Sequence, residues 1–327
     1  MTNDGFHTAL HGRRIAMSVL VLVGLSTSAC TSSTSSASPS STGSASPSSP
    51  VTTATPPAAT AYAAMVDINT GAITPLPASI ATSAVYYAVS PDHTMVAYSG
   101  CCSSPDPLFV ANIDGTHIRR ITAQGQDGHA AQWSPDGSLL VYQQRNDSTY
   151  ELGNLFVLDM RTGKRTQITN FDQTQSWGYW TTMPIFAPDG RSILFQLPRG
   201  QLPGQDNRTE DLWSVPVTGG KQTLVRRNAW QGGYSPNGRW LAYLSPAGAQ
   251  DALWITSVHG GRPRVLVHQA NLDWQRWSPD GTRISYRVDR SIYVLNVASG
   301  SATKVAEGGN PEWFDNHTLT AGNPELS

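Results

Sequence analysis

The sequence predicts an all-β protein, a β-propeller of six blades, from three observations. A turn of the Ser-Pro-Asp-Gly type recurs along the chain, a second series of Gly-containing turns alternates with it, and the composition is rich in turn residues. Charged residues make up only 14% of the chain, against about a quarter in ordinary globular proteins, while Gly and Pro number 29 and 22. This composition favours many short strands over a bundle of helices.

The first repeated motif is a tight turn between two strands. It reads VSPDHTMVAYS at 89–99, WSPDGSLLVYQ at 133–143, FAPDGRSILFQ at 186–196, YSPNGRWLAYL at 234–244 and WSPDGTRISYR at 277–287, then degenerates to WFDNHTLTA at 313–321. Serine suits the first position of a type I turn, proline fixes φ at the second, and glycine suits the fourth. The Asp or Asn residues of successive turns are 36 to 53 residues apart. A period near 45 is typical of a four-stranded propeller blade.

The second repeated motif predicts how the ring closes. Strands ending in a Gly-containing turn, such as LFVLDMRTGKRTQIT and IYVLNVASGSATKV, stand between the first motifs, and a further copy, AAMVDINTGAITPL, occupies 63–76. The propeller therefore begins with the outer half of a blade and ends, at 313–321, with the inner half of one. We expect these N- and C-terminal half-blades to pair, because the closed ring leaves no open sheet edge.

The WSPDG turn and the LW or LF strand that follows it resemble the bacterial WD40-like repeat of TolB-type propellers. The resemblance covers residues 61–327. It implies a non-enzymatic periplasmic or envelope protein that binds protein partners through its propeller. The chain departs from that family at its N-terminus, where a linker takes the place of an α/β domain.

The N-terminal segment predicts export and a lipid anchor. Arg13 and Arg14 precede an apolar run at 15–25, which is too short to span a membrane, and small residues then lead to Cys30. This resembles a lipoprotein signal over 1–29, with Cys30 acylated; the alternative is an ordinary cleaved signal with an incidental cysteine. Residues 30–60 lack charge and large apolar side chains, which predicts a disordered tether. We therefore expect a protein held at the outer face of the cytoplasmic membrane or in the cell envelope.

Motifs that carry chemistry are few. Cys101 and Cys102 are adjacent, so either a vicinal disulfide or two thiols would fit. The chain has no His-Glu-x-x-His and no Gly-x-Ser-x-Gly sequence, and its histidines are scattered. We expect no metal and no cofactor.

The aromatic residues predict where a ligand would bind. Trp133, Trp277 and Trp313 precede turns, and Trp213, Trp240 and Trp254 lie on strands, so these six are expected in the core between blades. Other aromatic and polar residues fall just before the innermost strands, on the face with the long loops. They are Tyr86, Tyr87, His129, Trp177, Trp180, Trp230, Gln231, Asp273, Trp274 and Asn310. A ring of such residues at the axial mouth suits sugar stacking or peptide capture; the alternative is that they plug the channel.

These observations favour a non-catalytic, membrane-tethered propeller that binds a protein partner or an envelope glycan through its loop-rich face. The alternative is a propeller enzyme of the lyase or cyclase type that acts on sugars or peptides at the axial pocket. The net charge of −1 argues against nucleic acid as a partner, because phosphate binding needs a basic surface. The oligomeric state stays open.

Overall fold

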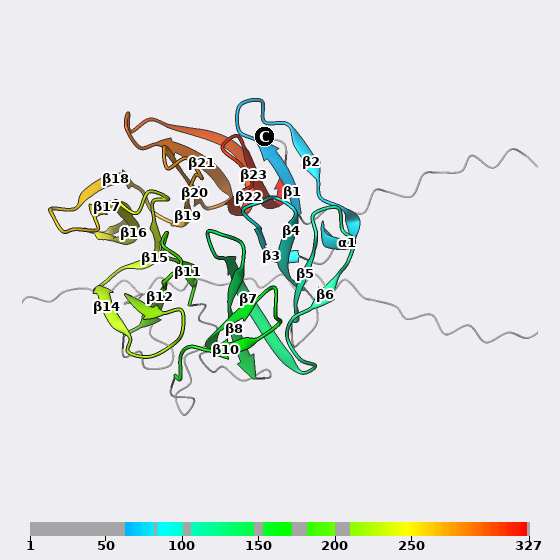
Figure 1. Ribbon diagram of the computed structural model, residues 1–327. Coiled ribbons are helices and arrows are strands. Elements are labelled where there is room, and N and C mark those ends of the chain that lie inside the picture. The colour runs from blue at the N-terminus through cyan, green and yellow to red at the C-terminus, as the bar shows by residue number, and fades with distance from the viewer. Residues whose placement is uncertain are drawn as a thin grey trace, which may run out of the picture. The chain divides into compact units, whose positions relative to one another are not determined.

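The computed structural model describes residues 63–81, 84–100, 106–146, 153–171, 182–199 and 210–325. These residues form 23 strands and one short helix, α1 (Ala78–Ala81), so the chain is all-β as expected (Figure 1). In this part of the chain no helix has the length and apolar character to cross a membrane. The signal segment, the linker with Cys30, the pair Cys101 and Cys102, and Trp177 and Trp180 lie outside the described residues.

Four sheets each consist of four consecutive strands that pair in antiparallel fashion. The first contains β3 (Ala84–Val89), β4 (Met95–Gly100), β5 (Leu108–Asn112) and β6 (Arg119–Arg120). The second contains β7 (Gln126–Trp133), β8 (Leu139–Asn146), β9 (Asn154–Asp159) and β10 (Arg165–Gln167). The third contains β11 (Ile185–Phe186), β12 (Ser192–Pro198), β13 (Glu210–Pro216) and β14 (Thr223–Arg226). The fourth contains β15 (Trp230–Tyr234), β16 (Trp240–Ala247), β17 (Gln250–Ser257) and β18 (Arg264–His268).

A seven-stranded sheet joins the two ends of the described chain. Its order is β19-β20-β21-β22-β23-β1-β2. These strands are β19 (Leu272–Trp277), β20 (Arg283–Val288), β21 (Ser291–Asn296), β22 (Ala302–Trp313), β23 (Thr318–Glu325), β1 (Ala63–Asp67) and β2 (Ile73–Pro75). The long strand β22 pairs with β21 through residues 302–307 and with β23 through residues 307–313. The N-terminal strand β1 pairs with the C-terminal strand β23, as the two half-blade motifs predict.

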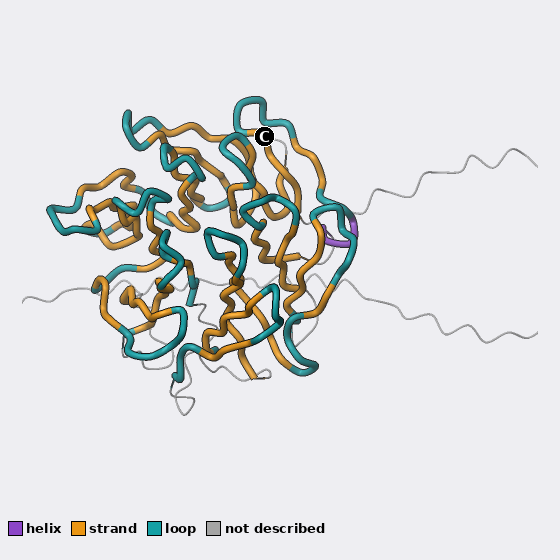
Figure 2. The backbone as a smooth tube through the Cα atoms, in the orientation of Figure 1, coloured by secondary structure: helices purple, strands orange, loops and turns teal. Residues whose placement is uncertain are grey.

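The sheets are set around a common centre, with the first strand of each sheet innermost (Figures 1 and 2). Strand β3 packs against β7, β7 against β11, β12 against β15, β15 against β19, β19 against β22, and β22 against β3. This closed circuit of contacts is the arrangement of a β-propeller.

The hydrophobic core lies between neighbouring sheets. One cluster joins Ala97 and Leu108 of the first sheet to Trp133, Leu140 and Tyr142 of the second. Three indole N–H groups also bridge neighbouring inner strands: Trp133 donates to the carbonyl oxygen of Ala88, Trp277 to that of Gly233, and Trp313 to that of Arg276. The expectation that the tryptophans before the turns lie between blades is therefore confirmed. Trp240 differs, because its side chain points outward and is 40% exposed.

The turns form as their residues predict. In the turn at 134–137, the hydroxyl of Ser134 donates to Asp136 Oδ1 (2.6 Å) and accepts a hydrogen bond from the backbone N–H of Leu139 (2.9 Å). Gly137 closes the turn at a φ of 71°, a left-handed conformation that glycine adopts without steric cost. The turn therefore fixes where the innermost strand ends and where the second strand begins.

Candidate functional site

When the innermost strands are aligned on their turns, one position faces the axis. This position lies two residues before the first residue of each turn, and its chemistry differs from one inner strand to the next. It is occupied by Ala88, Gln132, Ile185, Gly233, Arg276 and Glu312. The neighbouring turn residues repeat because the fold requires them. The side chains at this position do not repeat, so the fold does not require them.

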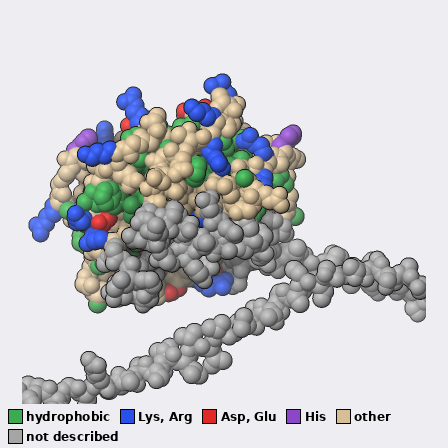
Figure 3. Space-filling model, turned by 90° about the horizontal axis from the view of Figure 1, so that it is seen from below, with side chains coloured by type: hydrophobic (Ala, Val, Ile, Leu, Met, Phe, Trp, Pro, Cys, Tyr) green, Lys and Arg blue, Asp and Glu red, His purple; other side chains and the backbone are tan. Residues whose placement is uncertain are grey.

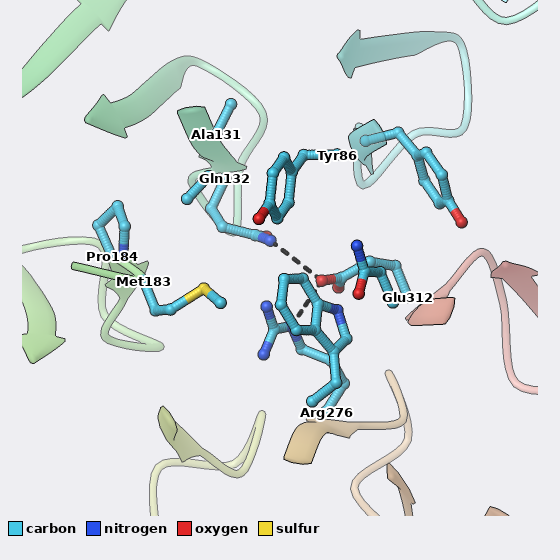
Figure 4. Close-up of a pocket in the computed structure, with 11 residues that line it drawn as sticks. Tyr86, Ala131, Gln132, Met183, Pro184, Arg276 and Glu312 are labelled. Carbon is cyan, nitrogen blue, oxygen red and sulfur yellow. Dashed lines mark hydrogen bonds and ion pairs between the residues drawn. The ribbon is translucent and has the colours of Figure 1, made fainter. Parts of the chain in front are cut away.

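Three of these side chains meet at the centre, and we call Gln132, Arg276 and Glu312 the axial layer (Figure 4). Arg276 Nε donates to Glu312 Oε1 at 2.7 Å, and Gln132 Nε2 donates to the same oxygen at 3.5 Å. Only 14% of the Arg276 side chain and 12% of the Glu312 side chain are exposed. Burial raises the pKa of the Glu312 carboxyl above its ordinary value, although the charge of Arg276 opposes the shift. The layer is thus a buried ion pair with an amide beside it.

Two residues nearer the loop-rich end, the backbone adopts the same irregular conformation at five of these six inner positions. Their φ angles lie between 43° and 55°, in a left-handed region that non-glycine residues rarely occupy; the residues are Ala130, Met183, Gln231, Trp274 and Asn310. At four of these positions the pairing register with the next strand shifts, as at a β-bulge. Such conformations cost about 1–3 kcal/mol each and concentrate at functional sites. The strain therefore marks the rim of the axial mouth.

Side chains from the second strands satisfy the backbone at this rim. Gln143 Oε1 accepts a hydrogen bond from the N–H of Thr182 (3.1 Å), and Gln196 Oε1 accepts one from the N–H of Gln231 (2.6 Å). Gln231 Oε1 in turn accepts one from the N–H of Trp274. Three of the five irregular positions are therefore anchored to the neighbouring sheet.

Two aromatic rings stack at the loop-rich end of the axis, and we call Tyr86 and Trp274 the mouth pair. Their centroids are 5.6 Å apart and their planes differ by 30°. His129 meets Tyr86 edge-on at a centroid distance of 6.2 Å. The mouth pair, Met183, Asn310 and the axial layer line a cavity of about 20 Å³, which has room for one water molecule. The described side chains thus nearly fill this end of the channel.

The structure corrects several of the expected mouth residues. The Trp230 side chain is 2% exposed and packs with Leu244, Leu253 and Leu272 in the core. It stands five residues before the first residue of its turn, and the bulge that follows leaves it facing the neighbouring sheet. Tyr87 lines the small cavity, but its side chain is also buried in a core cluster.

Other residues expected at the mouth form hydrogen bonds or ion pairs with nearby side chains. Asp273 accepts two hydrogen bonds from the guanidinium of Arg287, at 2.7 and 2.5 Å, and Arg287 also donates to Asn310 Oδ1 at 3.4 Å. His129 is buried beside Asp127, 3.7 Å away. Gln231 holds the rim as described above. Of the expected set, the structure brings Tyr86, Tyr87, Trp274 and Asn310 to the axial cavity.

A larger cavity lies on the other side of the axial layer, toward the Ser-Pro-Asp-Gly turns. We call it the short-turn cavity; its volume is about 210 Å³. The axial layer forms its inner end, and its walls include Gly233, Tyr234, Gln275, Trp277 and Trp313. Sequence reasoning missed both the axial layer and this cavity. Aligning the six turn motifs and examining the position two residues earlier would have found Gln132, Arg276 and Glu312.

The chemistry that these groups offer is binding through stacking and hydrogen bonds. Within the described ranges, no three or more His, Cys, Asp or Glu side chains are grouped so that they could hold a metal ion.

Comparison with known proteins agrees with the fold. The model of the dipeptidyl peptidase IV N-terminal region matches residues 247–324. The chain is 25% identical over 170 residues to an uncharacterized protein of Agrobacterium fabrum, a match covering 47% of this chain and 52% of the relative. It is 24% identical over 188 residues to dipeptidyl-peptidase 5 of Porphyromonas gingivalis, covering 53% of this chain and 26% of the relative. The matches thus span about half or less of these curated relatives.

Solved structures are similar over a larger share of the chain. A putative TolB from Agrobacterium tumefaciens superimposes with a TM-score of 0.62 at 15% identity, covering 82% of this chain and 100% of that one. TolB from Acinetobacter baumannii gives a TM-score of 0.54 at 15% identity, covering 80% of this chain and 63% of that one. An oligogalacturonate lyase in complex with manganese gives a TM-score of 0.51 at 17% identity, covering 76% of this chain and 73% of that one. At these identities the likeness concerns the fold alone, and the chain has the fold of a TolB-like β-propeller.

Proposed function

We propose that the chain is a non-catalytic binding propeller of the cell envelope, which binds a protein partner or an envelope glycan at the loop-rich end of its axis. One observation carries the proposal: the mouth pair, Tyr86 and Trp274, lies above a buried polar layer and on a rim of strained, well-anchored backbone. Rigid aromatic rings with a few polar groups are typical of binding sites.

We also propose a count of six blades. Strand β22 pairs along its first half with β21 and along its second half with β23. The seven-stranded sheet can therefore be divided into two four-stranded blades that share β22. Together with the four separate sheets, this makes six.

Export and lipid anchoring complete the proposal. The sequence of residues 1–30 supports it, and the linker at 31–60 would hold the propeller away from the membrane. Replacing the acylated residue, Cys30→Ser, should release the protein into the soluble fraction of the cell envelope. Continued recovery of the variant with membranes would contradict the anchor.

Nucleic acid is not the proposed partner. The net charge is −1, and Lys and Arg side chains are spread over the surface in Figure 3 instead of forming one patch.

The binding proposal is tested by capture from an envelope extract. The full chain is immobilised and compared with the double variant Tyr86→Ala/Trp274→Ala and with Trp240→Ala, which removes an exposed indole from the outside of a blade. The double variant should lose at least about tenfold of the captured protein or glycan, since stacked aromatic anchors dominate such interfaces. Trp240→Ala should bind normally. Equal capture by all three, with circular dichroism unchanged, would contradict the proposal.

A catalytic propeller of the lyase or cyclase type is the second candidate, and the buried Glu312 favours it. Burial raises the pKa of this carboxyl, which is the direction that a general acid needs. Turnover of a captured glycan or peptide that is lost in Glu312→Gln, with binding retained, would establish this second function.

A further inference from the structure

We infer that the short-turn cavity is a binding site for a single glycosyl residue, at the opposite end of the axis from the mouth pair. This site goes beyond the proposed function, because it lies on the face formed by the short turns and uses different residues.

The size of the cavity fits one ring. Its volume of about 210 Å³ equals that of about seven water molecules at roughly 30 Å³ each. The axial layer closes its inner end, so an extended peptide could not pass through it. The prolines of two turns, Pro236 and Pro279, line the cavity beside its aromatic walls.

The aromatic walls are held in place. The N–H of Trp277 donates to the carbonyl oxygen of Gly233 at 3.0 Å, and the N–H of Trp313 donates to that of Arg276 at 3.0 Å. Arg283 lies over the Trp313 ring, 5.9 Å from its centroid. Because the indole edges are already bonded, the rings contribute their apolar faces, which suit the C–H face of a sugar.

A buried acceptor in the wall lacks a partner. Gln275 is 1% exposed, and its Nε2 donates to the carbonyl oxygen of Gln231 at 2.5 Å, but among the described residues its Oε1 has no hydrogen-bond partner. A buried acceptor left unpaired costs about 1–3 kcal/mol. Gln275 lines the cavity, so a rotation of its amide would present this oxygen to a ligand hydroxyl.

The polar groups of the cavity favour an uncharged ligand that both donates and accepts hydrogen bonds. Arg276 and Glu312 neutralise each other, so the cavity needs no counter-charge. Gln275 Oε1 needs a donor, whereas the guanidinium of Arg276 and the amide of Gln132 are donors. Sugar hydroxyls meet both needs.

The space exists because position 233 is glycine. A Cβ placed there would lie 3.2 Å from Gln275 Nε2 and 3.6 Å from Trp277 Cδ1, both of which line the cavity. The φ angle of Gly233 is not positive, so the backbone does not require glycine. Valine at this position would therefore fill the cavity without backbone strain, with the Gln275 amide displaced by a few tenths of an ångström.

The test is calorimetric titration of the full chain with methyl glucoside, methyl mannoside and methyl N-acetylglucosaminide. At least one should bind saturably with a Kd on the order of 1 mM. Gly233→Val should weaken binding more than tenfold. The matched control is Gly309→Val, where a Cβ would lie 3.3 Å from Arg287 Nη1 at the loop-rich end and should leave the affinity unchanged.

A second variant keeps the test decisive if Gly233→Val does not fold. Gln275→Met removes the unpaired acceptor at similar volume and should also weaken binding more than tenfold, whereas Tyr86→Ala/Trp274→Ala should not. Absence of saturable binding by any glycoside would overturn the inference, as would binding of tripeptides in their place. Loss of glycoside binding in the variant Tyr86→Ala/Trp274→Ala would overturn the inference, because it would show that the glycoside binds at the mouth pair.

Discussion

The indole N–H of Trp277 donates a 3.0 Å hydrogen bond to the carbonyl oxygen of Gly233, on the innermost strand of the preceding sheet. The same contact joins Trp133 to Ala88 and Trp313 to Arg276. In each case the acceptor is the residue at the axis-facing position. The tryptophan that precedes a turn therefore fixes the distance between two inner strands and the placement of the axial residue between them.

Replacing one of these tryptophans should loosen a single junction. Trp133→Phe retains an aromatic ring but loses the bond to Ala88 and part of the packed area, which should lower the free energy of unfolding by about 1–3 kcal/mol. Urea titration measures the change. Trp240→Phe, at an exposed indole, should alter it by less than about 0.5 kcal/mol. Equal effects of the two substitutions would show that the inter-sheet bond contributes nothing.

The turn glycines should tolerate substitution according to how well the new residue adopts a positive φ. Gly137 has a φ of 71°, so Gly137→Val should destabilise the protein by about 1–2 kcal/mol and Gly137→Asn by less, since asparagine enters this region more readily. Thermal melting of both variants gives the order. A valine variant as stable as the asparagine variant would contradict the turn geometry.

Stability should depend on pH through His129. Burial, with the charge of Arg145, lowers the pKa of His129 from 6.5 to about 4. The unfolded chain therefore takes up a proton that the folded chain refuses between pH 6.5 and 4, and the free energy of unfolding should fall as the pH falls through this window. The urea midpoint of the native protein should therefore be lower at pH 5 than at pH 7.

The control for this pH dependence is His129→Gln, which removes the titrating group. Its urea midpoints at pH 7 and pH 5 should lie closer together than those of the native protein. An identical pH dependence in the two proteins would assign the effect to another group.

The fold could be predicted from the sequence because its signals are local and repeated. A turn such as Ser134–Gly137 has a residue requirement at each position, and five copies with a degenerate sixth, 36 to 53 residues apart, indicate blades. The pairing of β1 with β23 could be predicted as well, because the half-blade at 63–76 has no other partner in the repeat.

The site was harder to predict because side-chain direction near the axis depends on the bulges. Trp230 and Trp274 stand one residue apart in their repeats, five and four residues before their turns. The bulge brings Trp274 to the axis and leaves Trp230 in the core. The axial layer was missed for another reason: Gln132, Arg276 and Glu312 are more than 30 residues apart in sequence and resemble ordinary surface residues until the blades are aligned.

Every inference about the axis depends on a ring closed by β1 and β23, so the most direct measurement is disulfide trapping of that pair. Met65 lies opposite Thr320 in the antiparallel register, and Thr320 Oγ1 donates to the backbone oxygen of Glu312. In a chain with Cys30, Cys101 and Cys102 changed to serine, Met65→Cys/Thr320→Cys should oxidise completely and gain about 2–4 kcal/mol of stability over its reduced form. The mis-registered pair Met65→Cys/Thr318→Cys should not. Failure of the first pair to form a disulfide, or equal oxidation of both, would contradict the closed propeller.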